Sequence, residues 1–421
     1  MKTKTIVSLC VLALILAALA CQIPGRSQPT STADTVPPVE DTSEPTDAEP
    51  VLETETSTPT TPPIETPTDT EVPPVLLPVF STPVIYTFEM FTPTRGWAVT
   101  QDQDHLLITE DGGVTWLEAT PAGLGSLPSG YTTFGIRPFF LDESTAWFTP
   151  TSDGSGLLYH TQDGGSTWTS TTVPFDNARY HFLDINIGYA LVDLGAGAGS
   201  HYVAIYRTLD GGASWTLAFT HEPGESKSLR EGGAKNGITF RGVDHGWIGG
   251  SIPMDDYFYL FYTEDGGVTW GQETDISLPG IFASSMLDVW QPQFVSDTTA
   301  FLPVRAYTPG GSTELLICRS IDAGQTWSYQ GTVEDGLAVD FFNLDEGWLA
   351  AKLALYHTLD GGLTWSTMTT AGIPAGEFFL KVNFVDSQHG WALTTPDDMA
   401  WDPLNLYRTT DGGTSWVLLL P

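Results

Sequence analysis

The sequence predicts an all-β fold, a seven-bladed β-propeller of four-stranded antiparallel blades, and three observations lead to this prediction. An eight-residue phrase of the form Thr-x-Asp-Gly-Gly-x-Thr-Trp occurs seven times, and a second phrase of an aromatic residue, a polar turn and usually Gly-Trp precedes each copy. The third observation is the spacing, because successive aspartates of the first phrase are 52, 47, 55, 57, 38 and 51 residues apart. That spacing is about the length of one blade, a unit that buries its faces only against its neighbours.

The first phrase predicts a hairpin turn. Its copies are TEDGGVTW (109–116), TQDGGSTW (161–168), TLDGGASW (208–215), TEDGGVTW (263–270), SIDAGQTW (320–327), TLDGGLTW (358–365) and TTDGGTSW (409–416). The Asp can accept hydrogen bonds from backbone N–H groups of its own turn, the following Gly supplies a positive φ, and the Trp starts the outgoing strand. We therefore predict a structural role, neither catalytic nor metal-binding, for seven aspartates: Asp111, Asp163, Asp210, Asp265, Asp322, Asp360 and Asp411.

The second phrase predicts another hairpin in each repeat. Its copies are FTPTRGWAV (91–99), FLDESTAWF (140–148), FLDINIGYA (182–190), FRGVDHGWI (240–248), FVSDTTAFL (294–302), FNLDEGWLA (342–350) and FVDSQHGWA (384–392). Two hairpins give four strands per blade, named A to D from the axis outward. No strand is left over to complete another blade, so we expect blade-to-blade packing to close the ring. Whether residues 74–80 add an outer strand stays open.

The pairing of the two phrases resembles the Asp-box, or BNR-type, repeat family. In spacing it is most similar to the propellers of the photosystem II assembly-factor family and their bacterial relatives, and the resemblance covers roughly 84–421. Asp-box propellers include sialidases, sortilin-like receptors and assembly chaperones, so the fold alone does not decide the activity. The resemblance to the photosystem factors implies an assembly or scaffolding role for an envelope complex, while nothing in the sequence indicates photosynthesis itself.

Residues 1–21 predict a secretory signal segment. Lys2 and Lys4 precede an apolar stretch that is too short and wrongly flanked for a stable spanning helix. The tetrapeptide ALAC that ends at Cys21 resembles a bacterial lipobox, with Ala where Leu is usual, which implies a lipid on Cys21 after cleavage. The alternative is ordinary cleavage that yields a secreted protein. Both predict an extracytoplasmic protein, anchored to a membrane by lipid or secreted.

We predict that residues 22–82 form a disordered linker and that residues 83–421 form the propeller. The linker is rich in Thr and Pro and has eleven acidic residues against Arg26, so it cannot bury enough apolar area to offset its ordering entropy. The propeller keeps 40 acidic and 13 basic residues, a net charge near −27. Such a domain repels phosphate backbones, so we expect no nucleic-acid partner.

Chemistry-bearing motifs are scarce. The sequence has no HExxH, CxxC, GxSxG or Walker motif, and we predict no metal and no cofactor. The run GAGAGS (195–200) lacks the spacing of a dinucleotide motif and predicts a flexible loop. We predict that Cys318, which lies in an apolar strand, is a small core residue.

A sialidase-like glycoside hydrolase or a carbohydrate-binding module is the alternative function. A sialidase needs three arginines around a carboxylate, a Tyr–Glu pair and an Asp acid at the channel mouth. Arg207, Arg319 and Arg408 are all predicted on strand C, away from the axis, and only Ile136-Arg137-Pro138 echoes the family's arginine motif, in altered order. We therefore predict a protein that is not an enzyme.

The long connections predict the binding face. Those between strands D and A and between B and C emerge opposite the Asp-containing turns, and loops on a rigid scaffold commonly carry binding residues. Trp290 and Trp401 lie in these connections and belong to neither repeated phrase. We predict both as ligand-binding residues.

One position at the start of strand A is also predicted to face the ligand. It lies ten residues before the aromatic residue at the Trp position of Gly-Trp, which we call the aromatic slot. The residues at this position are Thr87, Arg137, Arg179, Gly237, Gln291, Ala338 and Lys381. We predict a basic patch that binds an acidic protein segment or acidic glycan and is formed by Arg137, Arg179 and Lys381. The alternative, that each base pairs with a neighbouring acid, stays open. We predict a monomeric, lipid-anchored binding or scaffold propeller with a protein or glycan partner.

Overall fold

The computed structural model describes residues 76–124, 137–150, 156–222, 228–272, 276–397 and 403–420. The chain divides into two units, 1–71 and 72–421, and every described residue belongs to the second. The predicted signal segment, Cys21 and the predicted linker up to residue 75 lie outside the described residues. Within the described ranges, no helix has the length and apolar character needed to cross a membrane.

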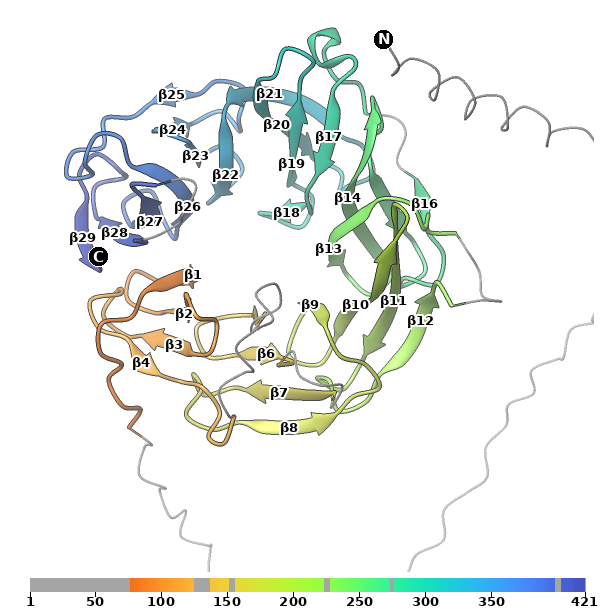
Figure 1. Cartoon of the computed structure of the whole chain (residues 1–421), viewed down its shortest axis with the longest axis horizontal. Helices are drawn as coiled ribbons and strands as arrows, with labels where there is room; N and C mark the ends of the chain where they lie inside the picture. Colours follow the sequence, from red (N-terminus) through yellow and green to blue (C-terminus); the bar gives the residue numbers. More distant parts are fainter. Residues whose placement is uncertain are drawn as a thin grey trace, which may run out of the picture. The chain divides into compact units, whose positions relative to one another are not determined.

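The predicted fold class is confirmed: the described strands form seven four-stranded antiparallel blades arranged in a ring (Figure 1). Blade 1 contains β1 (Ile85–Met90), β2 (Gly96–Thr100), β3 (Leu106–Thr109) and β4 (Leu117–Glu118). Blade 2 contains β5 (Phe139–Phe140), β6 (Ala146–Phe148), β7 (Leu157–Thr161) and β8 (Thr169–Thr172). Blade 3 contains β9 (Ala178–Phe182), β10 (Gly188–Gly197), β11 (Ser200–Thr208) and β12 (Thr216–Thr220). Blade 4 contains β13 (Ala234–Arg241), β14 (His245–Asp255), β15 (Leu260–Thr263) and β16 (Gly271–Gln272).

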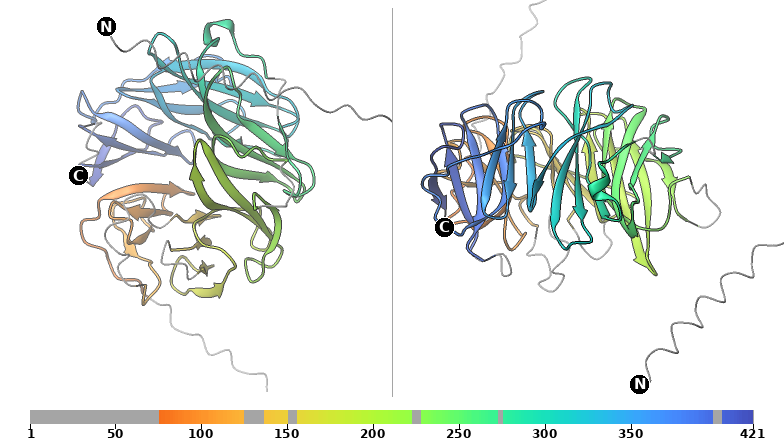
Figure 2. Two further views of the ribbon diagram at one scale, coloured as in Figure 1. Left: turned by 45° about the vertical axis from the view of Figure 1, so that its right-hand side comes forward. Right: turned by 90° about the horizontal axis from the view of Figure 1, so that it is seen from above.

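The remaining blades follow the same order, with one added strand. Blade 5 contains β18 (Gln293–Phe294), β19 (Ala300–Tyr307), β20 (Thr313–Ser320) and β21 (Ser328–Glu334), and β17 (Met286–Val289) and the short 3-10 helix η1 (Gly280–Phe282) precede it. Blade 6 contains β22 (Gly336–Phe341), β23 (Gly347–Ala351), β24 (Ala354–Thr358) and β25 (Ser366–Thr367). Blade 7 contains β26 (Phe378–Phe384), β27 (Gly390–Thr395), β28 (Asn405–Thr409) and β29 (Val417–Leu420). In the side view the strands run through the thickness of the disc (Figure 2).

Blades 4 and 5 depart from the repeat because β17 joins them into one nine-stranded sheet. On one side Ser251 of β14 pairs with Asp288, and on the other Val304 of β19 pairs with Val289. The inner strand of blade 5 is thus split into β17 and β18, with Pro292, which has no N–H to donate, between them. A Cβ at Gly249 would lie 2.3 Å from the Trp290 carbonyl oxygen, so this close approach requires glycine.

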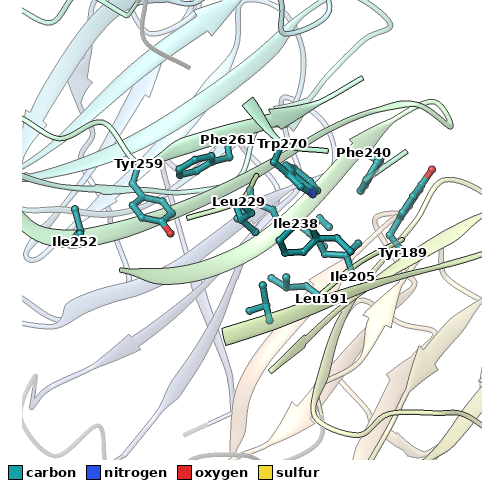
Figure 3. Packing of buried hydrophobic residues seen from close by; sticks show 13 residues of the cluster. Tyr189, Leu191, Ile205, Leu229, Ile238, Phe240, Ile252, Tyr259, Phe261 and Trp270 are labelled. Carbon is teal, nitrogen blue, oxygen red and sulfur yellow. The ribbon is translucent and has the colours of Figure 1, made fainter. Parts of the chain in front are cut away.

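Aromatic side chains pack the blades against one another. The aromatic residue that opens the second phrase of one blade stacks on the Gly-Trp slot of the blade before it, with ring centroids 3.4 to 3.8 Å apart in the four tightest pairs: Trp147–Phe182, Tyr189–Phe240, Phe301–Phe341 and Trp348–Phe384. Figure 3 shows the buried cluster between blades 3 and 4, with Tyr189, Phe240 and Trp270. Between blades 4 and 5 the rings of Trp247 and Phe294 are 5.3 Å apart and tilted by 45°, a looser contact.

Polar side chains on the inner strands link consecutive blades. Asn383 of blade 7 accepts a hydrogen bond from the backbone N–H of Met90 in blade 1 at 2.7 Å. Asp340 of blade 6 accepts one from the N–H of Phe384 in blade 7 at 2.5 Å. Burial raises the pKa of Asp340 to about 7. A His181 ring nitrogen lies 3.0 Å from the Phe240 carbonyl oxygen in the next blade.

The ring closes between blades 7 and 1 without an exchanged strand in the described residues. The indole N–H of Trp391 donates to the Gly112 carbonyl oxygen at 2.9 Å, and Arg408 donates to the Asp111 carbonyl oxygen at 3.2 Å. The chain enters along the outer edge of blade 1, where Val79 forms a single bridge with Leu117. Residues 76–80 therefore add a short outer contact to blade 1, which answers the question left open by the sequence.

Candidate functional site

The Asp-containing turns hold their carboxylates inside the turn. One oxygen of Asp111 accepts from the Thr115 N–H at 2.9 Å and the other from the Thr115 hydroxyl at 2.7 Å. All seven aspartates have such bonds from the Ser or Thr four residues later. At Asp411, bonds from the Ser415 hydroxyl and N–H hold the carboxyl pKa below its usual range. These aspartates have the contacts expected of structural residues.

The two faces of the disc are distinguished by the turns they carry. The N–H of Gly112, in an Asp-containing turn, donates to Thr94 in the A–B turn of the same blade at 2.8 Å. Both kinds of turn therefore share one face, which we call the Asp-turn face. The start of each strand A lies at the other end of the blade, on what we call the loop-rich face. Among the described residues, no group of three His, Cys, Asp or Glu side chains could hold a metal ion.

The position predicted at the start of strand A has one register in five blades. Each residue pairs with the residue two after the aromatic slot: Thr87 with Val99, Arg179 with Leu191, Gly237 with Gly249, Ala338 with Ala350 and Lys381 with Leu393. Arg137 lies two residues before β5, and Gln291 lies between β17 and β18. The seven positions thus surround the axis at the loop-rich face.

Arg137 and Arg179 lie close together on neighbouring blades. Burial lowers the pKa of Arg179, and the positive charge of Arg137 lowers it further, while Asp193 acts in the opposite direction. No hydrogen bond or ion pair joins the Arg179 guanidinium to another described residue. Asp193 instead lies 3.3 Å from a ring nitrogen of His201. The structure therefore brings together two cations of which Arg179 is half-buried and unpaired within the described chain.

Lys381 lies in a different environment. Its ammonium group is 3.0 Å from a carboxylate oxygen of Glu89 in blade 1. It lines a pocket of about 290 Å³ together with Arg305, and that pocket does not include Arg137 or Arg179. The three predicted bases thus do not form one patch: Lys381 has an acidic partner, as the alternative interpretation expected, while Arg137 and Arg179 lie close to each other and away from it.

Of the two predicted tryptophans, Trp290 belongs to the described residues. Trp290 is half-buried in the break between β17 and β18, and the Arg305 guanidinium lies over its ring at 5.2 Å. It packs against the cluster that contains Phe301 and Val339, so its ring supports Arg305 as much as it faces solvent. Trp401 lies outside the described residues.

The sequence reasoning missed a buried lysine that contacts His201, whose ring lies next to Asp193. Lys235 is 1% exposed, and its ammonium group donates to the His201 carbonyl oxygen at 2.6 Å and to that of Glu231 at 2.7 Å. Burial lowers its pKa to about 8. The prediction of a flexible loop at 195–200 was wrong: β10 and β11 form a continuous hairpin there, and that hairpin carries Asp193 and His201. The alternation of Gly and Ala in 195–200 was the sequence signal that could have predicted these strands.

The geometry expected of a sialidase is not assembled in the described residues. Arg408 donates to the Asp111 and Pro93 carbonyl oxygens of the next blade. A Tyr–Glu pair does occur, since Tyr407 donates to Glu377 at 3.3 Å, but it is buried in blade 7 and its other partners are Asn405 and Thr394. Arg408 therefore bonds the backbone of blade 1, and no hydrogen bond or ion pair within the described residues joins it to this pair.

Comparisons with known proteins agree with the fold. No family model matches the chain. It is 23% identical over 320 residues to the photosystem II assembly protein Ycf48 of Synechococcus sp. (strain JA-2-3B'a(2-13)), which covers 72% of this chain and 80% of that protein. It is 26% identical over 135 residues to the photosystem II assembly lipoprotein Ycf48 of Synechococcus sp. (strain CC9902), which covers 32% of this chain but only 37% of that protein. The chain is similar to Ycf48 assembly proteins.

A structure of YCF48 bound to D1 peptide is 19% identical, with a TM-score of 0.49, over 81% of this chain and 98% of that chain. The resemblance to the photosystem II assembly-factor family, predicted from the repeated phrases, is confirmed by the similarity to the Ycf48 sequences.

Proposed function

We propose that this protein is a non-enzymatic, extracytoplasmic scaffold propeller, anchored by lipid on Cys21, whose loop-rich face binds an acidic segment of a protein partner. The partner would belong to an envelope complex whose assembly the propeller assists. The similarity to Ycf48 assembly proteins supports the assembly role, and the lipobox-like tetrapeptide at Cys21 supports the anchor.

The observation that carries the proposal is the arginine pair. Holding the guanidinium of Arg179 half-buried beside Arg137 is unfavourable by itself, because burial and a like charge both disfavour the charged form. An anionic ligand reverses that balance, since an arginine binds a carboxylate through two parallel charge-assisted hydrogen bonds. In a domain whose net charge is near −27, such a pair is a local exception that selects an acidic group.

A binding assay with a defined probe tests this proposal. The probe is a fluorescein-labelled decapeptide rich in Asp and Glu, and anisotropy gives its affinity for the full chain. The double variant Arg137→Glu/Arg179→Glu is expected to weaken binding by about a hundredfold or more, since two charge-assisted contacts become repulsive. Arg95→Glu, a single charge reversal on the Asp-turn face, is the control and leaves binding unchanged. Equal affinity of the double variant and the parent chain rejects the proposal.

A carboxylate-bearing glycan is the second candidate ligand, because the same arginine geometry fits a uronate. Oligogalacturonate and a neutral oligosaccharide of equal length separate the two possibilities in the same assay. Saturable binding of oligogalacturonate that exceeds that of the acidic peptide, and that is lost in the double variant, assigns the face to glycans instead of proteins.

The location is tested separately. Cys21→Ser is expected to move the protein from the membrane fraction to the soluble extracytoplasmic fraction of cells and to abolish incorporation of a radiolabelled fatty acid. Retention of both properties in the variant contradicts lipid anchoring through Cys21.

A further inference from the structure

The grooves between blades 1 and 2 and between blades 4 and 5 have the same design on the Asp-turn face. Each has a pocket, of about 520 Å³ between blades 1 and 2 and about 570 Å³ between blades 4 and 5. The turns at their walls, 109–116 and 263–270, have the identical sequence TEDGGVTW. Equivalent residues therefore occupy equivalent places, and the first groove shows what the second can accommodate.

The groove between blades 1 and 2 holds a segment of the protein's own chain. Residues 76–80 run along the edge of β4, where the Phe80 N–H donates to the Trp116 carbonyl oxygen and the Glu118 N–H donates to the Pro78 carbonyl oxygen, both at 2.8 Å. Leu77 packs against the small core that contains Trp97 and Ile108. This is the addition of an extended segment to a sheet edge, with one apolar side chain directed inward.

The groove between blades 4 and 5 lacks such a segment among the described residues. By the repeat, the backbone groups equivalent to those of Trp116 and Glu118 are those of Trp270 and Gln272. In the described part of the chain β16 pairs only with β15 and is the edge strand of its sheet. An unpaired edge presents N–H and C=O groups that an extended chain can satisfy.

The second groove has no arginine at the position equivalent to Arg95. In blade 1, Arg95 lies 2.7 Å from Glu110 and neutralises it. In blade 4 the equivalent positions hold His245 and Glu264, and within the described residues Glu264 makes no ion pair. Arg241, on the same blade as Glu264, is already 2.6 Å from Asp297 on the opposite wall.

A buried donor at the base of the same pocket has no partner. The indole N–H of Trp247, a residue 4% exposed that lines the pocket, has no hydrogen bond within the described structure. The equivalent indole, that of Trp97, donates to the Asp142 carbonyl oxygen at 3.0 Å. The indole N–H groups of Trp116, Trp327 and Trp365 also lack a partner within the described structure, so the Trp247 donor supports a site only together with the open edge of β16 and the carboxylate of Glu264.

We propose that the groove between blades 4 and 5 binds an extended peptide segment of a protein partner through the edge of β16, with an Arg or Lys side chain of that segment paired with Glu264. The ring of Tyr262, 36% exposed in the pocket wall, provides an aromatic surface for the cation. The site lies on the face opposite the arginine pair and selects the opposite charge, so it is independent of the proposed function above.

Peptide selection followed by matched variants tests the proposal. A phage-displayed random octapeptide library is selected on the immobilised full chain, and the selected peptides are synthesised with a fluorophore. They are expected to contain Arg or Lys next to apolar residues and to lose about tenfold or more in affinity for Glu264→Gln, since a charge-assisted hydrogen bond is removed. Glu110→Gln, the same change in the identical turn of blade 1, leaves the affinity unchanged.

The backbone contact is tested at β16. Gln272→Pro removes the edge N–H and is expected to weaken binding, whereas Gln272→Ala keeps that N–H and binds within about threefold of the parent chain. If Gln272→Pro fails to fold, hydrogen exchange of the parent chain decides, because bound peptide should protect the amide of Gln272. Selected peptides without a basic residue, affinity unchanged by Glu264→Gln, or loss of binding in Arg137→Glu/Arg179→Glu each overturn the proposal.

Discussion

The contact between blades 7 and 1 and the contact between blades 4 and 5 hold the ring together by different means. Between blades 7 and 1 the contacts are made by side chains. Asn383 accepts a hydrogen bond from the backbone N–H of Met90, and Trp391 donates one to the carbonyl oxygen of Gly112. Between blades 4 and 5, the backbone of β17 pairs with a strand on each side, near the loop-rich face. On the Asp-turn face Arg241 of blade 4 forms an ion pair with Asp297 of blade 5, while the indole N–H of Trp247 has no acceptor within the described residues.

This difference follows from one departure in the repeated phrase. In blades 1, 3 and 7 the carbonyl of the first turn glycine accepts the indole N–H of the preceding blade. In blade 5 that position is Ala323, with a φ of +61°, and the indole of Trp247 makes no bond to it. A repeat protein can therefore keep its ring while one contact becomes looser, provided that another contact compensates.

The largest expected effect is a break of the backbone contact between blades 4 and 5. Gly249→Ala places a Cβ 2.3 Å from the Trp290 carbonyl oxygen, so β17 must move. We expect a loss of about 3 kcal/mol in the free energy of unfolding, measured by urea denaturation. Gly280→Ala, where a Cβ would meet nothing within 4 Å, is the control. If Gly249→Ala is as stable as this control, β17 does not hold the two blades.

A smaller effect is expected when the indole N–H groups of Trp391 and Trp247 are removed one at a time. Trp391→Phe and Trp247→Phe remove the same atoms, but only Trp391 donates a hydrogen bond. We expect Trp391→Phe to destabilise the protein by about 1–2 kcal/mol more than Trp247→Phe, because it leaves a buried carbonyl without its donor. Urea midpoints of the two variants give the difference. Equal losses would show that the indole bond adds nothing to ring closure.

The side-chain links near the axis also predict a pH dependence. Burial raises the pKa of Asp340 from 3.8 to about 7, so the folded protein keeps a proton that the unfolded chain releases. The stabilising contribution of this group is complete below about pH 4 and is lost as the pH rises through about 7. The parent chain should therefore lose stability relative to Asp340→Asn between pH 5 and pH 8 in urea denaturation. Asp345→Asn, at an exposed acid, is the control, and parallel profiles of all three proteins contradict the prediction.

The smallest expected effect concerns the exposed pair at the groove between blades 1 and 2. Both side chains of Arg95 and Glu110 are about half exposed, at 48% and 54%. Arg95→Ala should cost about 0–1 kcal/mol, because water and salt screen such pairs. A larger loss in thermal unfolding, above about 2 kcal/mol, would mean that the pair holds residues 76–80 in place.

The sequence predicted what the repeat determines. The turns, the four strands per blade and the register of the position shared by Arg179 and Lys381 all follow from local patterns that recur. It could not predict pairings between distant residues that occur only once. Glu89 neutralises Lys381 across 292 residues, and β17 pairs with β14 although no repeated phrase marks it.

The candidate site was predicted only in part for the same reason. Arg137 and Arg179 were recognised because they depart from the repeat at one shared position. Lys235 and His201 have no such position, since one lies on an inner strand and the other on an extended hairpin, and only the folded chain brings them within 2.6 Å. Charge and repeat position therefore find a site, but its neighbours come from tertiary structure.

The entry of the chain at the outer edge of blade 1 determines how the ring bears tension. A pull on residue 76 reaches the disc through the two backbone hydrogen bonds that join 78–80 to 116–118. Those bonds lie on the strand farthest from the axis, and the links between blades 7 and 1 involve Met90 and Gly112 instead. Under load this outer edge can therefore separate from blade 1 while the contacts between blades 7 and 1 are kept.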